Sequence, residues 1–187
     1  MNRFAISALA VLLSACQTMY DGNEDSPYYL VPVGSTLILH NAVAIPPQRA
    51  GVYLQGGQIL PLAQVNQYYP HCKFEVRAPR EMAQTVTPDE FAIAKSVQEV
   101  VHAMRADHIQ LARVSVGISI GLGIDGGGPS VQTYATRMDL RSANQPEVFR
   151  LTCGQWEYPP FARHVTIGEM RRALGAVFTL RLAAGGG

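Results

Sequence analysis

The sequence predicts a mainly β fold, either an antiparallel sandwich or a small barrel, with one or two short helices. Short stretches of alternating or β-branched residues recur along the chain at a spacing typical of antiparallel strands. The pair Gly56-Gly57 separates two of these stretches and fits a tight hairpin turn. Helix signals interrupt the pattern at only two places. Together these observations predict an antiparallel architecture.

The stretch CKFEVR shows the pattern on which the strand predictions depend. Cys72, Phe74 and Val76 alternate with charged residues, so one face of this strand is apolar and the other is polar. The residue ranges expected to form strands on such grounds are 36–40, 50–55, 58–62, 72–77, 113–120, 131–140, 147–153 and 176–182.

The stretch TIGEMRRALG carries the clearest helix signal. Thr166 is an expected N-cap, and Glu169 stands at the position of a capping box. Gly175 is placed to end the helix. We therefore expect one short helix here.

The stretch TPDEF carries a second helix signal. Thr87 precedes Pro88, which suits the first helical position, and Glu90 follows three residues after the cap. The continuation over residues 91–104 fits a strand face and a helix face about equally. We expect one helical turn followed by a strand, and the choice between strand and helix over 91–104 stays open.

The amino terminus has the organisation of an export signal. Arg3 precedes an apolar run over residues 4–13, which is shorter than the roughly 20 residues that a membrane-spanning helix needs. Small residues then lead to Cys16 in the sequence LSAC, which resembles the lipobox of bacterial lipoproteins. The resemblance implies cleavage before Cys16, acylation of this cysteine, and anchoring in a membrane by its acyl chains. Gln17 stands where an aspartate would favour the inner membrane, so we expect the outer membrane, at its periplasmic face.

These features divide the chain into four expected parts. Residues 1–15 form the signal peptide, and residues 16–29 form the lipidated cysteine and a flexible tether. A single mostly β domain is expected over residues 30–182, followed by a disordered tail over 183–187.

The charge balance excludes one class of partner. The chain has 15 Lys+Arg and 14 Asp+Glu, and removal of the signal peptide takes away Arg3, which leaves 14 of each sign. A domain without net positive charge has no field that attracts nucleic acid. We therefore expect no nucleic-acid partner.

Two cysteines remain once Cys16 is assigned to the lipid. Cys72 and Cys153 both lie on apolar strand faces, and an oxidising periplasm favours a disulfide between them. If the two strands are antiparallel neighbours, the expected pairs are 72 with 153, 74 with 151, and 76 with 149. A metal site would need further ligands at close spacing, which the sequence does not offer.

Catalytic motifs occur only as isolated matches. The sequence GISIG places Ser119 in a G-x-S-x-G pattern, but a glycine-rich stretch follows instead of the helix that a nucleophile elbow requires. The sequence GLGIDG over 121–126 likewise lacks the helix that a dinucleotide site needs. No H-E-x-x-H motif is present. We expect no cofactor and no metal, and we keep a serine hydrolase that uses Ser119 as an alternative.

Aromatic residues gather on both sides of the expected disulfide. The disulfide would bring Tyr68 and Tyr69 close to Trp156 and Tyr158, with Gln155, Glu157 and Gln67 at hand. Aromatic faces beside amides and carboxylates suit the recognition of a glycan or an extended peptide. The alternative interpretation is that these rings cap one end of the core.

The sequence thus predicts a lipid-anchored, non-catalytic module that binds a component of the cell envelope or assists in its assembly. The expected partners are the membrane, through acyl chains on Cys16, and either peptidoglycan or an envelope protein. A serine hydrolase and a carrier of lipophilic ligands with a barrel interior as its pocket are the alternatives.

Overall fold

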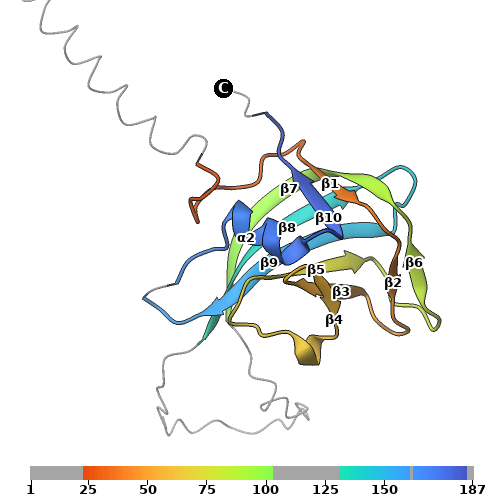
Figure 1. The fold of residues 1–187 in the computed structure, drawn as a ribbon, viewed down its shortest axis with the longest axis horizontal. Coiled ribbons are helices and arrows are strands. Elements are labelled where there is room, and N and C mark those ends of the chain that lie inside the picture. Colours follow the sequence, from red (N-terminus) through yellow and green to blue (C-terminus); the bar gives the residue numbers. More distant parts are fainter. Residues whose placement is uncertain (1–22, 103–130, 161, 185–187) are drawn as a thin grey trace, which may run out of the picture.

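The computed structural model describes residues 23–102, 131–160 and 162–184 (Figure 1). The expected strand over 113–120, Ser119 and Cys16 lie outside these residues. Within them, an eight-stranded antiparallel sheet curls into a half-barrel around one helix, which confirms the mainly β prediction.

The sheet has the strand order β10-β1-β7-β8-β9-β5-β3-β4, and a separate two-stranded sheet pairs β2 with β6. The strands are β1 (Thr36–Leu39), β2 (Val43–Ile45), β3 (Gly51–Gln55), β4 (Gln58–Leu60), β5 (His71–Val76), β6 (Gln84–Val86), β7 (Asp89–His102), β8 (Gln132–Arg141), β9 (Val148–Glu157) and β10 (Phe178–Arg181). The helix is α2 (Ile167–Leu174), and a 3-10 turn, η1, covers Leu62–Gln64. The sequence did not predict β2 and β6, which have three residues each and no hairpin signal beside them, whereas the equally short β4 follows the Gly56-Gly57 turn.

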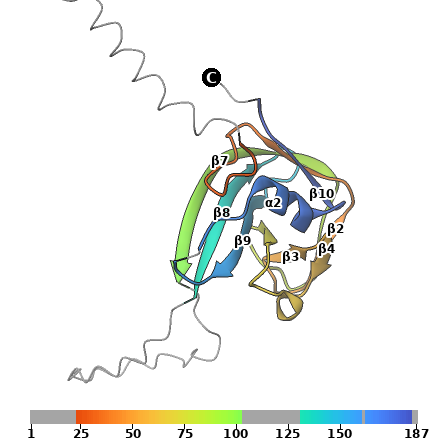
Figure 2. The same ribbon diagram turned by 60° about the vertical axis from the view of Figure 1, so that its left-hand side comes forward.

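The core fills the concave side of the half-barrel. The rings of Phe74, Phe91 and Phe178 are fully buried there, and the centroid of Phe74 lies 4.9 Å from that of Phe178 and 5.8 Å from that of Phe91. Helix α2 packs against the same side, as both ribbon views show (Figures 1 and 2), and its Met170 and Leu174 are 0% exposed. Each such side chain contributes about 1.5–3 kcal/mol by its burial.

Strands β5 and β9 pair almost as the sequence predicts. Cys72 lies opposite Cys153, and Phe74 lies opposite Leu151, which confirms two of the three expected pairs. The third expected pair is wrong, because a bulge after Glu75 moves Val76 opposite Val148. The two cysteines form a disulfide with a Cα–Cα distance of 4.0 Å.

The second helix signal does not produce a helix. Strand β7 begins at Asp89 and continues to His102, so the expected helical turn is wrong. Of the open choice over 91–104, residues 91–102 form a strand, and residues 103 and 104 lie outside the described residues. Residues distant in sequence hold the backbone at this point instead. The amide of Gln145 exchanges two hydrogen bonds of 2.9 Å with the backbone of Thr87, and Ser142 Oγ donates to the carboxylate of Asp89 at 2.6 Å. These contacts fix the backbone in an extended path.

Helix α2 forms as expected from its local signals. The side chain of Thr166 accepts a hydrogen bond from the backbone of Glu169, whose carboxylate accepts one from the backbone of Thr166. The same carboxylate lies 2.6 Å from the guanidinium of Arg163. These interactions lower the pKa of Glu169 to about 2, with the Arg163 hydrogen bond as the main cause.

The β3–β4 turn packs directly against the end of α2. Gly56 and Gly57 both have positive φ, of 57° and 78°, which confirms the expected hairpin turn. Gly57 donates a backbone hydrogen bond of 3.0 Å to the carbonyl of Ala173. A Cβ on Gly175 would lie 2.2 Å from the Cα of Gly57, so the two segments need glycine where they cross.

Contacts with the half-barrel begin before Leu30, the expected start of the domain. Glu24 forms an ion pair of 2.6 Å with Arg171, and its carbonyl accepts a hydrogen bond from the backbone of Ile167. Residues 23–29 therefore lie against the body of the protein.

Candidate functional site

Three of the four expected aromatic residues meet at the end of β9. The ring of Tyr68 lies edge-on to Trp156, with centroids 5.6 Å apart, and stacks on Tyr158 at 6.0 Å with an interplanar angle of 19°. The hydroxyls of Tyr68 and Tyr158 are 3.2 Å apart. Tyr68 is 45% exposed and Tyr158 is 39% exposed. We call these three residues the aromatic trio.

The trio lies on the convex face of the sheet. Strand β9 continues past Cys153 to Glu157, whereas the expected strand ended at residue 153. Because side chains alternate along a strand, Cys153 and Gln155 point to the concave side and Trp156 points to the convex side. Gln155 is only 3% exposed and donates to Glu157 Oε1 at 2.7 Å. The expectation that Gln155 and Glu157 accompany the rings is therefore wrong.

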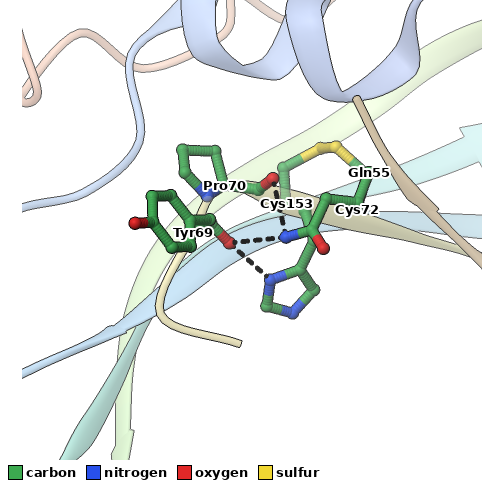
Figure 3. The surroundings of a disulfide bond; sticks show 6 residues. Gln55, Tyr69, Pro70, Cys72 and Cys153 are labelled. Atoms are coloured by element: carbon green, nitrogen blue, oxygen red, sulfur yellow. Dashed lines mark hydrogen bonds between the residues drawn. A yellow bond between two sulfur atoms is a disulfide. The ribbon is translucent and has the colours of Figure 1, made fainter. Parts of the chain in front are cut away.

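Tyr69 contributes to a different surface. Its side chain is 64% exposed and borders a shallow groove of about 420 Å³ between the β3–β4 turn and α2. Figure 3 shows Tyr69 and Pro70 beside the disulfide, with α2 lying next to them. The groove, which we call the Tyr69 groove, is lined by Gln55, Gly56, Tyr69, Pro70, Glu169, Arg172 and Ala173. The four expected residues thus form two adjoining surfaces.

Hydrogen bonds hold the loop that joins these two surfaces. The side-chain amide of Gln55 donates to the carbonyl of Asn66 at 2.8 Å and to that of Tyr69 at 3.3 Å, the second of which Figure 3 draws. The backbone of Asn66 donates back to the side-chain oxygen of Gln55 at 3.0 Å. On the other side, the backbone of Trp156 donates to the carbonyl of Gln67 at 2.7 Å. The loop is therefore fixed to both β3 and β9, and its tyrosines are held in place before any ligand arrives.

The disulfide and a half-buried histidine continue this support into β5. His71 donates from Nδ1 to the carbonyl of Tyr69 at 3.0 Å. Burial lowers the pKa of His71, against the opposite effect of this hydrogen bond. Next to it, the Cys72–Cys153 bond ties β5 to β9 at the base of the loop.

The two surfaces expose both aromatic and polar groups. The trio offers two half-exposed tyrosine faces with hydroxyls at their edge, and the Tyr69 groove adds the exposed guanidinium of Arg172. Glu169, at the wall of the groove, is engaged by Arg163 and its own helix cap. In the part of the chain that the structure describes, no group of three or more His, Cys, Asp or Glu residues could hold a metal ion.

Sequence reasoning missed the groove and found the trio. Gln55 and Arg172 are more than a hundred residues apart, and only the packing of α2 on the β3–β4 turn brings them together. The one local feature that marks the groove in the sequence is Gln55, the polar last residue of β3, directly before Gly56-Gly57. Helix α2 also occupies the concave side of the half-barrel, where the carrier alternative requires its ligand cavity.

No protein-family model, curated protein or solved structure matches this chain. Among the described residues, no helix has both the length and the apolar character required to cross a membrane.

Proposed function

We propose that this protein is a lipid-anchored module at the periplasmic face of the outer membrane that binds another envelope component and does not catalyse a reaction. The observation that carries the proposal is the aromatic trio, whose stacked tyrosines are exposed and held in place by a hydrogen-bonded loop. Large aromatic side chains are usually packed inside a protein, so aromatic rings that are exposed and fixed in place indicate a surface that meets a partner. The LSAC sequence at residues 13–16 supports the anchor, and the disulfide suits an oxidising compartment.

The ligand class that best fits the trio is a glycan. A sugar ring has an apolar face that packs on an aromatic ring and polar groups around its rim. The planes of Tyr68 and Tyr158 differ by 19°, and their hydroxyls lie together at one edge, so the pair presents apolar area beside hydrogen-bonding groups. The glycan strand of peptidoglycan is the ligand of this chemistry that a periplasmic module would meet.

An envelope protein is the second candidate ligand. The Tyr69 groove favours it, because an extended peptide can lie between Tyr69 and α2 with an acidic group against Arg172.

Co-sedimentation of the full-length protein with purified peptidoglycan sacculi tests the proposal. Tyr158→Ala removes one exposed ring of the trio, and the affinity is expected to fall roughly tenfold, since truncation of an aromatic anchor typically costs more than 1 kcal/mol. The matched control is Met82→Ala, which removes a side chain that is 79% exposed on another loop and is expected to leave binding unchanged.

Two results would contradict the glycan assignment. Wild-type protein that stays in the supernatant excludes sacculi as the ligand, and equal binding by Tyr158→Ala removes the trio from the interaction. A photo-crosslinking residue at position 69 in intact cells then tests the second candidate. It is expected to give one discrete protein adduct that Arg172→Ala weakens, and the absence of such an adduct would exclude the groove as a peptide site.

A further inference from the structure

Three apolar side chains are exposed at the first part of the chain that the structure describes. Tyr28, Leu30 and Val33 are 64%, 44% and 65% exposed, whereas Val31 between them is 1% exposed. Tyr29, which also lies between them, is partly buried and packs against the core. The segment therefore turns one set of side chains inward and presents the other outward. We call the outward set the N-terminal patch.

Contacts with the half-barrel fix the segment that bears this patch. The carbonyl of Pro27 accepts a hydrogen bond of 3.0 Å from the side chain of Gln98, and the backbone of Gly34 donates one of 2.9 Å to the carbonyl of Ile93. Further upstream, Glu24 is bound to α2 through Arg171. These contacts fix the backbone of the segment, so the patch is part of the surface of the domain.

The length of chain before the patch limits where it can lie. If Cys16 carries the lipid, only residues 17–22 separate the anchor from Asn23. A chain of this length spans at most about 25 Å even when fully extended. A domain of this size has a radius of gyration of about 15 Å and hence a diameter of roughly 40 Å. The link is shorter than the domain is wide, so the side that bears Asn23 stays next to the membrane.

We propose that the N-terminal patch rests on the phospholipid surface to which the protein is anchored. This inference depends on the lipid anchor of the proposed function. Tyrosine is enriched at membrane–water interfaces, because its ring is apolar and its hydroxyl is polar, and Leu30 and Val33 add apolar area beside it. Burial of this area adds to the attachment by acyl chains and fixes the orientation of the domain.

This orientation directs the aromatic trio away from the bilayer. In both ribbon views the N-terminal segment, in red to orange, lies at the top, and the arrowhead of β9 lies below it (Figures 1 and 2). A membrane placed against the patch leaves the convex face near Trp156 open to the periplasm.

Tryptophan fluorescence of the full-length, lipidated protein in vesicles tests the inference. The native protein has a single tryptophan, Trp156, so a second one reports its own position. Val33→Trp places the reporter in the patch, and Met82→Trp places it at a control site that is 79% exposed. The vesicles consist of phosphatidylethanolamine and phosphatidylglycerol, with and without bromine on the acyl chains, because bromine quenches only tryptophan that reaches the lipid.

The expected result is that the protein floats with the vesicles and that brominated lipid quenches the added emission of Val33→Trp. The emission of Trp156 and of the Met82→Trp reporter is expected to stay unchanged. Flotation with no quenching of the Val33→Trp reporter, or with equal quenching at both sites, overturns the patch and leaves the anchor intact. Failure of the wild type to float refutes the anchor itself, and the patch inference falls with it.

Discussion

Loss of the Cys72–Cys153 bond provides a sharp test of how the half-barrel is stabilised. The two residues are 81 positions apart, so the disulfide closes a long loop in the unfolded chain. In the chain-entropy model such a loop contributes about 4.5 kcal/mol to the free energy of unfolding. Both residues are buried, at 0% and 1% exposed, so the bond is shielded from reductant while the domain is folded. We therefore perturb the bond by reduction in denaturant followed by refolding.

Urea denaturation of the oxidised and reduced protein measures the effect. With a slope of about 2 kcal/mol per molar urea, the loss corresponds to a fall of about 2 M in the midpoint. The double variant Cys72→Ala/Cys153→Ala is the control, and its midpoint is expected to be low with or without reductant. Coincident curves for oxidised and reduced wild type would refute the reasoning, as would two free thiols in protein isolated from the cell envelope.

Four further substitutions test separate parts of the account. Arg163→Gln is expected to lower stability by about 1–2 kcal/mol at neutral pH. The hydrogen bond from Arg163 lowers the pKa of Glu169 from 4.5 to about 2, so this contribution is complete above pH 4.5 and is lost as the pH falls toward 2. A difference in urea midpoint between variant and wild type that is the same at neutral pH and near pH 2 would contradict this. Gly175→Ala is expected to cost about 2–4 kcal/mol, and Gly56→Ala about 1 kcal/mol. Both residues have φ of 57°, but a Cβ on Gly175 meets backbone at 2.2 Å and one on Gly56 meets nothing within 4 Å, so equal thermal shifts would disprove the close contact. Cys16→Ala is expected to abolish palmitate incorporation and release the protein from the membrane fraction, and labelling that persists in the variant would exclude this cysteine as the acylation site.

Local signals in the sequence were reliable where the interacting groups are close together in the chain. The helix cap at Thr166 and Glu169 joins residues three apart, and the turn at Gly56-Gly57 joins Gln55 to Gln58, also three apart. Both could therefore be predicted. The cysteine pairing could also be predicted, because the two strands carry matching alternation around Cys72 and Cys153.

Contacts between distant residues account for the errors. Thr87, Pro88 and Glu90 resemble the start of a helix. Gln145, 58 residues after Thr87, hydrogen-bonds the backbone of Thr87 and the carboxylate of Asp89, and β7 is extended from Asp89 onward. The bulge before Val76 could not be read from either strand alone. Gln155 turned out to lie across the sheet from the trio, because β9 continues beyond Cys153 and its side chains keep alternating.

The central claim, that the aromatic trio binds an envelope glycan, can be tested through Trp156 itself. It is the single tryptophan of the chain and its ring contacts Tyr68, so its emission reports on the trio directly. Titration with soluble peptidoglycan fragments is expected to change this emission to saturation in the wild type, with a weaker midpoint in Tyr158→Ala. Emission that stays constant across the titration, or changes equally in the variant, would contradict the account.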